Sequence, residues 1–106
     1  MMIRQPVALS AELWDAARAT CAKKDLSALP AVRLEPYVEG TSLQILHIGP
    51  YDAEAPTIQR MHEWIAANGY VETGEHHEIY VSDPRRAAPE KLKTILRQPI
   101  RAASAA

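Results

Sequence analysis

The segment His76–Arg86 holds the residues best suited to chemistry, a carboxylate and an aromatic ring two positions apart. Alternation along a strand places Glu78 and Tyr80 on one face and His77 and Ile79 on the other. A carboxylate beside an aromatic ring suits a pocket for a flat cation, and it also suits a hydrolytic site. The plainer alternative is a glutamate on the solvated face of an antiparallel sheet.

Three further aromatic residues are candidates for a ligand site around this pair. Tyr51 follows a Gly-Pro turn and can reach the mouth of a cleft, or it can simply pack against the turn. Trp64 and Tyr37 are candidates to cover a ligand, although aromatic residues at the edge of a helix or strand more often belong to the core. We therefore expect the ligand-binding residues among Glu78, Tyr80, Tyr51, Trp64 and Tyr37.

Composition excludes several classes of function. The chain has 106 residues, 12 basic and 13 acidic, with a formal charge of -1. This balance gives no reason to expect nucleic acid or an anionic membrane as a partner. No apolar run approaches the roughly 20 residues of a membrane span. The single cysteine, Cys21, allows no internal disulfide, and we expect a reducing cytoplasm.

The sequence predicts neither a metal nor a cofactor. Its four histidines match no zinc pattern, because His76 and His77 point to opposite faces of a strand and the other two lie on separate elements. There is also no glycine-rich loop of the kind that binds phosphate groups. We therefore expect no bound metal and no cofactor.

Hydrophobic periodicity predicts alternating helices and strands. Ser10 is a good N-cap for a helix to about Lys24, and Asp52 is a candidate cap for a second helix that ends at Asn68-Gly69. The predicted strands are 2–5, 32–39, 42–48, 77–82 and 94–98, with 42–48 apolar on both faces like a central strand.

These elements predict an α+β fold, a mostly antiparallel sheet with two helices packed on one face. The length suits one domain, which we place at residues 1–101, followed by a disordered tail at 102–106.

Four segments in order resemble the GyrI-like family of small-molecule-binding domains. They are Leu46–Tyr51, Trp64–Tyr70, His76–Arg86 and Ala88–Pro99, and the strong part of the similarity runs from 32 to 100. The resemblance implies a strand-helix-strand-strand module, of which family members usually carry two copies with a ligand cleft between them. It also implies that the carboxylate aligned with Glu78 lies at the base of that cleft, with aromatic walls.

The resemblance leaves three functions open. The first is a binding domain for small hydrophobic molecules, including cations as in the multidrug-binding members. The second is a hydrolase of small electrophilic or xenobiotic compounds, with Glu78 as general base and Tyr80 or Tyr51 as proton donor. The third is a protein-binding modulator of a topoisomerase or a transcription regulator. Because only one module is present, the resemblance also implies a homodimer that restores the second half of the cleft.

Overall fold

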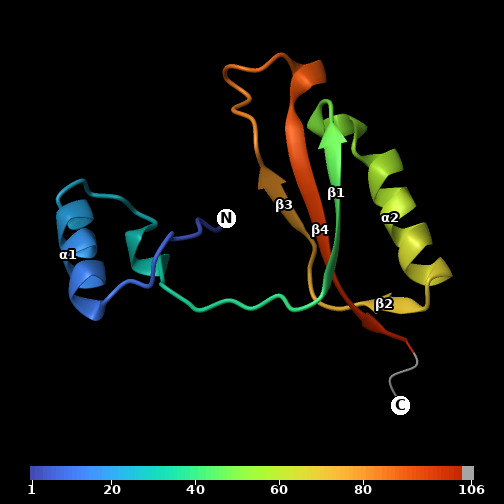
Figure 1. Ribbon diagram of the computed structural model, residues 1–106. Helices are drawn as coiled ribbons and strands as arrows, with labels where there is room; N and C mark the ends of the chain where they lie inside the picture. Colours follow the sequence, from blue (N-terminus) through green and yellow to red (C-terminus); the bar gives the residue numbers. More distant parts are fainter. Residues whose placement is uncertain (104–106) are drawn as a thin grey trace. The chain divides into compact units, whose positions relative to one another are not determined.

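The computed structural model describes residues 1–103, which form two compact units (Figure 1). The first unit spans Met1–Tyr37 and the second begins at Val38. The single domain predicted over residues 1–101 stays a prediction. Neither α1 nor α2, the two α-helices of the described chain, is long and apolar enough to cross a membrane.

The first unit contains α1, Ala11–Ala22, and a short 3-10 helix, Leu29–Ala31. Ser10 caps α1 as predicted, since its hydroxyl accepts a hydrogen bond from the Leu13 amide at 3.2 Å. The strands predicted at 2–5 and 32–39 are wrong, because both segments are irregular. Alternation alone does not make a strand: a strand also needs a neighbour for its amides and carbonyls.

The second unit is built around β4, Lys93–Ala102, which pairs antiparallel with β1 (Ser42–Ile48), β2 (Tyr70–Glu72) and β3 (His77–Tyr80). The predicted α+β class with an antiparallel sheet is confirmed. The expectation that 42–48 is the central strand is wrong. This strand pairs only with β4, and β4 occupies the centre because it is the longest strand and has partners on both sides (Figure 1).

The last strand also runs further than predicted, through Pro99 to Ala102. Proline is tolerated there because the ladder needs no donor from it: the Pro99 carbonyl accepts from the Thr73 amide at 2.9 Å. The Ile100 amide donates instead to the Thr41 carbonyl at 3.0 Å. The predicted tail, 102–106, therefore begins within β4, and residues 104–106 lie outside the described part of the chain.

Helix α2, Ala55–Ala67, packs on the sheet through Met61 and Ile65, which are 6% and 3% exposed. Leu96 of β4 is 1% exposed and completes the core. Asp52 is not the cap of this helix. It lies in a 3-10 helix, Tyr51–Ala53, and the N-cap position belongs to Glu54.

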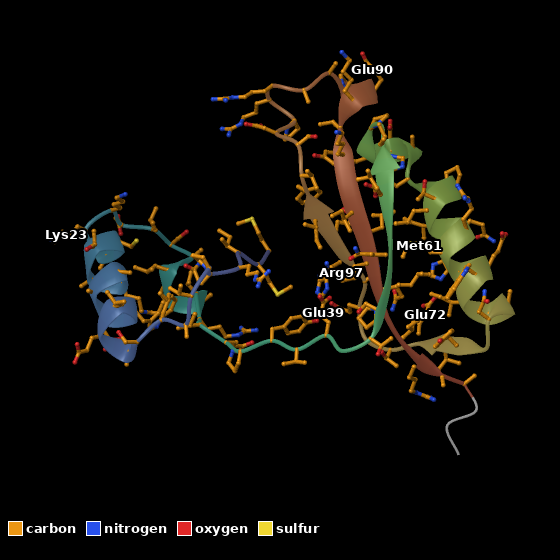
Figure 2. All side chains as sticks on the ribbon, in the orientation of Figure 1. Lys23, Glu39, Met61, Glu72, Glu90 and Arg97 are labelled. Carbon is orange, nitrogen blue, oxygen red and sulfur yellow. The ribbon has the colours of Figure 1, made fainter. Side chains whose placement is uncertain are left out.

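The sheet face that carries Leu96 and faces α2 is called the helix face below. On the opposite face, Glu39 joins two side chains of the sheet, His77 and Arg97, and the Arg97 guanidinium lies 2.9 Å from its carboxylate (Figure 2). Arg97 also donates to Gln44 at 3.0 Å. These contacts hold the segment before β1 against β4 and β3.

Gly69, which follows the end of α2, allows a test of backbone strain. Gly69 has φ +77°, and a Cβ built there would meet no atom within 4 Å. Gly69→Val should therefore lose about 1 kcal/mol or more of unfolding free energy from backbone strain alone, and Gly69→Asn should lose clearly less. Thermal unfolding in a Trp14→Phe background, where Trp64 reports the second unit, measures both. Equal losses in the two variants would contradict this account.

Candidate functional site

The register of β3 on β4 decides where Glu78 and Tyr80 point. Glu78 pairs with Leu96, and Tyr80 pairs with Thr94. Residues opposite each other in an antiparallel pair share a face, and Leu96 and Thr94 are buried beneath α2. Glu78 and Tyr80 therefore lie together on the helix face, as the alternation predicted. Glu78 is half-buried there, whereas Tyr80 is 61% exposed.

Two tyrosines adjoin the Glu78 carboxylate. The Tyr80 hydroxyl donates a hydrogen bond to Glu78 Oε2 at 2.9 Å. The Tyr51 ring meets the Tyr80 ring edge to face, with centroids 5.4 Å apart and planes at 72°. Tyr51 is thus brought to the predicted site. The hydrogen bond to Glu78 raises the pKa of Tyr80, so its hydroxyl keeps its proton at neutral pH.

Glu54 is the residue that the sequence analysis missed. It is only 5% exposed, and burial raises its pKa to about 7, with the hydrogen bond to Glu78 and the Glu78 charge adding to the effect. The same hydrogen bond lowers the pKa of Glu78. Below about pH 7 the pair therefore shares one proton, held on Glu54 and donated to an ionised Glu78. Glu54, Glu78, Tyr51 and Tyr80 are called the acidic cluster from here on.

A signal for Glu54 was present in the sequence. The predicted apolar stripe of α2 contains Ile58, Met61 and Ile65, and Glu54 continues it one turn towards the N-terminus. A carboxylate on an apolar stripe is a candidate for burial. The helix backbone begins there too, since the Ile58 amide donates to the Glu54 carbonyl at 3.0 Å.

His47 holds the loop that carries Tyr51 and Glu54. It is 7% exposed and belongs to the core. Its Nε2 lies 3.0 Å from the Pro50 carbonyl and its Nδ1 lies 3.1 Å from the Thr57 hydroxyl. Because a carbonyl only accepts, Nε2 must carry a proton, and a neutral ring then accepts from Thr57.

Two buried polar atoms lie in this part of the fold without a hydrogen-bond partner among residues 1–103. They are Glu54 Oε1 and Thr94 Oγ1. Thr94 is fully buried and pairs across the sheet with Tyr80 on one side and His47 on the other. An ionised Glu54 would leave a buried charge with too few donors, which is the physical reason that its proton is retained.

Trp64 and Tyr37 are the other two aromatic residues that the sequence predicts at the site. Trp64 stacks on Tyr70, with ring centroids 5.8 Å apart, and lines a cavity of about 210 Å³ with Leu43 and Ile45 of β1. Tyr37 belongs to the first compact unit. The roles of Trp64 and Tyr37 in ligand binding therefore stay predictions.

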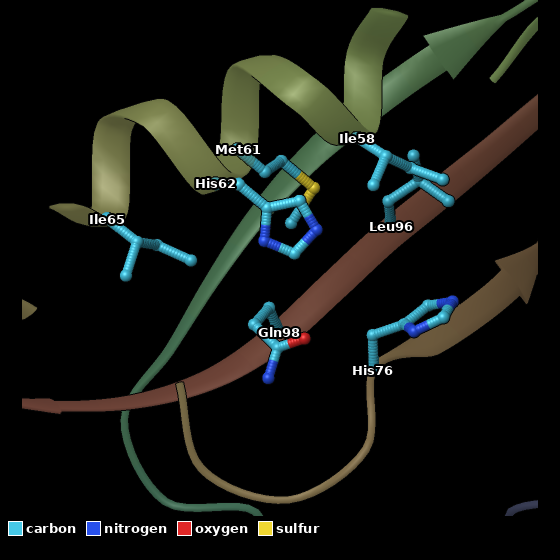
Figure 3. A pocket seen from close by; sticks show the side chains of 7 residues that line it. All are labelled: Ile58, Met61, His62, Ile65, His76, Leu96 and Gln98. Carbon is cyan, nitrogen blue, oxygen red and sulfur yellow. The ribbon is translucent and has the colours of Figure 1, made fainter. Parts of the chain in front are cut away.

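A pocket of about 70 Å³ opens on the helix face (Figure 3). Side chains of α2 form one wall, Leu96 and Gln98 of β4 form the floor, and His76 stands beside β3. His76 precedes Glu78 by two residues and faces the same way, because both alternate with His77. In the described part of the chain, no group of three or more His, Cys, Asp or Glu side chains is arranged to hold a metal ion.

Comparison with known proteins agrees with this architecture. The family model described as "GyrI-like small molecule binding domain" matches residues 21–101. No curated protein matches the chain significantly.

Solved structures from Listeria innocua are similar over most of the chain. One, described as a hydrolase, is 38% identical with a TM-score of 0.80 and covers 92% of this chain and 52% of its own. Another, described as an uncharacterized conserved protein, is 40% identical with a TM-score of 0.82 and covers 92% of this chain and 50% of its own. The present chain thus spans about half the length of these structures.

The shared proton predicts an unusual dependence of stability on pH. Glu54 keeps its proton in the folded state up to about pH 7, whereas an unfolded glutamate loses it near pH 4.5. Unfolding free energy should therefore fall as pH rises from 4.5 through 7, by roughly 3 kcal/mol in total. The lowered pKa of Glu78 acts oppositely, and its contribution is lost only as pH falls below 4.5. Stability should be greatest near pH 5.

Glu54→Gln tests this assignment, because it keeps the shape of the side chain and cannot ionise. The variant should lose the decline between pH 4.5 and 7 and be more stable than the parent above neutrality. Urea unfolding followed by Trp64 fluorescence, in a Trp14→Phe background, measures the effect. Glu63→Gln, on the exposed side of α2, is the matched control and should behave as the parent. An unchanged decline in Glu54→Gln would place the titrating group elsewhere.

Proposed function

Because the chain belongs to the GyrI-like small-molecule-binding domain family, we propose that it binds small, partly hydrophobic cations at the acidic cluster. The observation that carries the proposal is the Glu78 carboxylate, which accepts a hydrogen bond from Tyr80, whose ring in turn meets that of Tyr51, on a face that also carries apolar side chains. A cation there gains Coulomb attraction from the carboxylate and cation–π attraction from Tyr51 and Tyr80, about 1 to 2 kcal/mol in the latter case when desolvated.

The shared proton contributes to this binding in a specific way. An ionised pair of glutamates would repel each other and would each need a counter-ion. With the proton on Glu54, the cluster carries a single negative charge, matched to one positive charge on a ligand. A positive charge near Glu54 also stabilises its ionised form. A ligand with two positive charges would therefore pair with both carboxylates and release the proton from Glu54.

A hydrolase is the second candidate, and the same pair of glutamates favours it. Glu78 would take a proton from water as that water attacks an electrophilic carbon, and protonated Glu54 or the hydroxyl of Tyr80 or Tyr51 would donate a proton to the leaving oxygen. A pKa of about 7 suits Glu54 better for this than the higher pKa of a tyrosine. The similar structure described as a hydrolase supports the candidate. Recovery of a bound compound intact, rather than as product, would favour binding.

We also propose that two copies of the chain associate. Leu46 and Ile48, on the sheet face opposite α2, are 49% and 59% exposed and form an apolar surface suited to a second copy. We propose a cytoplasmic location as well, because Cys21 is a free thiol and a reducing compartment keeps thiols in this state.

The binding proposal predicts a charge-specific effect of Glu78→Gln. The affinity for butylammonium should fall about tenfold or more, since a lost charge contact is worth roughly 1.4 kcal/mol or above. The affinity for 1-butanol, which has a similar shape and no charge, should not change. Titrations followed by NMR measure both, with Glu63→Gln as the control for surface charge. Equal losses for the cation and the alcohol would contradict a role for the Glu78 charge.

The association proposal predicts a dimer in sedimentation equilibrium at micromolar concentration. Leu46→Asp should shift the chain to monomer, because it places a charge in the apolar surface. Lys93→Asp, at the end of the same sheet face, also adds negative charge but removes no apolar side chain. It should leave a larger fraction of dimer than Leu46→Asp does. A monomeric parent protein would refute the proposal.

A further inference from the structure

Residues that line the pocket of Figure 3 are neighbours of the acidic cluster along α2 and across the sheet. The wall of the pocket is formed by Ile58, Met61 and Ile65 of α2, and Ile58 follows Glu54 by one helical turn. Its floor includes Leu96, which pairs directly with Glu78 across β3 and β4. The carboxyl groups of Glu54 and Glu78 therefore lie next to residues of α2 and β4 that line the pocket.

Two of the three polar side chains that line the pocket are hydrogen-bonded within the protein. Gln98 Nε2 lies 3.1 to 3.4 Å from the carbonyl oxygens of Thr73, Gly74 and Pro99. The His62 ring is hydrogen-bonded to Glu72, and His76 is the third polar side chain of the lining. What the pocket offers a ligand is therefore mainly contact with aliphatic side chains.

The size of the pocket limits what it can hold. A dry, apolar cavity of about 150 Å³ binds benzene in another protein, and this pocket has about half that volume, about 70 Å³. Because benzene has six carbon atoms, half of that volume holds about three carbon atoms. An aromatic ring is too large to be enclosed.

We infer that the ligand of the proposed site is a short aliphatic ammonium ion, whose charged end meets Glu78 and whose chain of about three carbons enters the pocket between α2 and β4. This inference rests on the proposed binding function and makes it more specific. It replaces the flat cation that the aromatic residues alone suggested, because the rings of Tyr51 and Tyr80 flank the charged end and the pocket beyond it is aliphatic.

A series of n-alkylammonium ions from methyl to hexyl tests the inference on the full chain. Each methylene that enters the pocket should raise the affinity about fourfold. The rise should continue to propyl, and the affinity should level off by hexyl. NMR titration measures affinity, and the methyl resonances of Ile58, Met61 and Ile65 should shift more with propylammonium than with methylammonium.

Two variants of Ile58 change the capacity of the pocket in opposite directions. Ile58→Phe should fill it and flatten the series, with methylammonium bound as before. Ile58→Ala should enlarge it and move the plateau to longer chains. Val38→Phe, at a fully exposed position of the same compact unit, is the matched control and should leave the series unchanged.

The outcomes separate this inference from the function it rests on. Affinity that depends on Glu78 but not on chain length would overturn the aliphatic pocket and leave cation binding standing. Affinity that rises without limit to hexyl would overturn it as well, since the chain would then lie along an open surface. Failure of every ion to bind would overturn both proposals.

Discussion

The pairing register of β3 on β4 is the constraint on which the site depends. Side chains alternate along a strand, so a slip of one residue would turn Glu78 and Tyr80 to the opposite face and bring His77 and Ile79 beneath α2. The observed register, with Glu78 opposite Leu96, sets the carboxylate at the edge of the core. Gln98 of β4 helps to hold this register, because its Nε2 donates to the carbonyl oxygens of Thr73 and Gly74 in the segment between β2 and β3.

The site brings two carboxyl groups close together, which lowers the stability of a protein core. Two carboxyl groups close together cannot both ionise without a large unfavourable energy, so the fold holds a proton between Glu54 and Glu78. Such an arrangement lowers the free energy of unfolding near neutral pH. It persists because the surrounding structure holds the two carboxyl groups in place. The hydrogen bonds of His47 to Pro50 and Thr57 supply part of that constraint, since they hold the loop on which Glu54 and Tyr51 lie.

The acidic cluster and the pocket beside it lie entirely within the second compact unit. The second compact unit therefore carries a charged group, aromatic rings and an aliphatic pocket on a single face. The cleft between two modules that the resemblance implies stays a prediction. Association of two copies would then add to a site that already has its main chemical groups, rather than create it.

The sequence by itself determined the local features of this protein. The alternation of β3, the cap at Ser10, the end of α2 at Gly69 and the α+β class all follow from short-range patterns, because dihedral preferences and periodicity are local properties. The same patterns failed at 32–39 and for the central strand, since a strand exists only with a partner that may be distant in the sequence.

Only the tertiary structure decided which residues meet. Glu78 and Tyr80 could be placed on one face from sequence, but the partial burial of Glu78 could not, and Glu54 lies beside Glu78 although 24 positions separate them. The stacking of Trp64 on Tyr70 is likewise a tertiary contact. The raised pKa of Glu54 likewise comes from burial and from a neighbouring charge, and both exist only once the chain has folded.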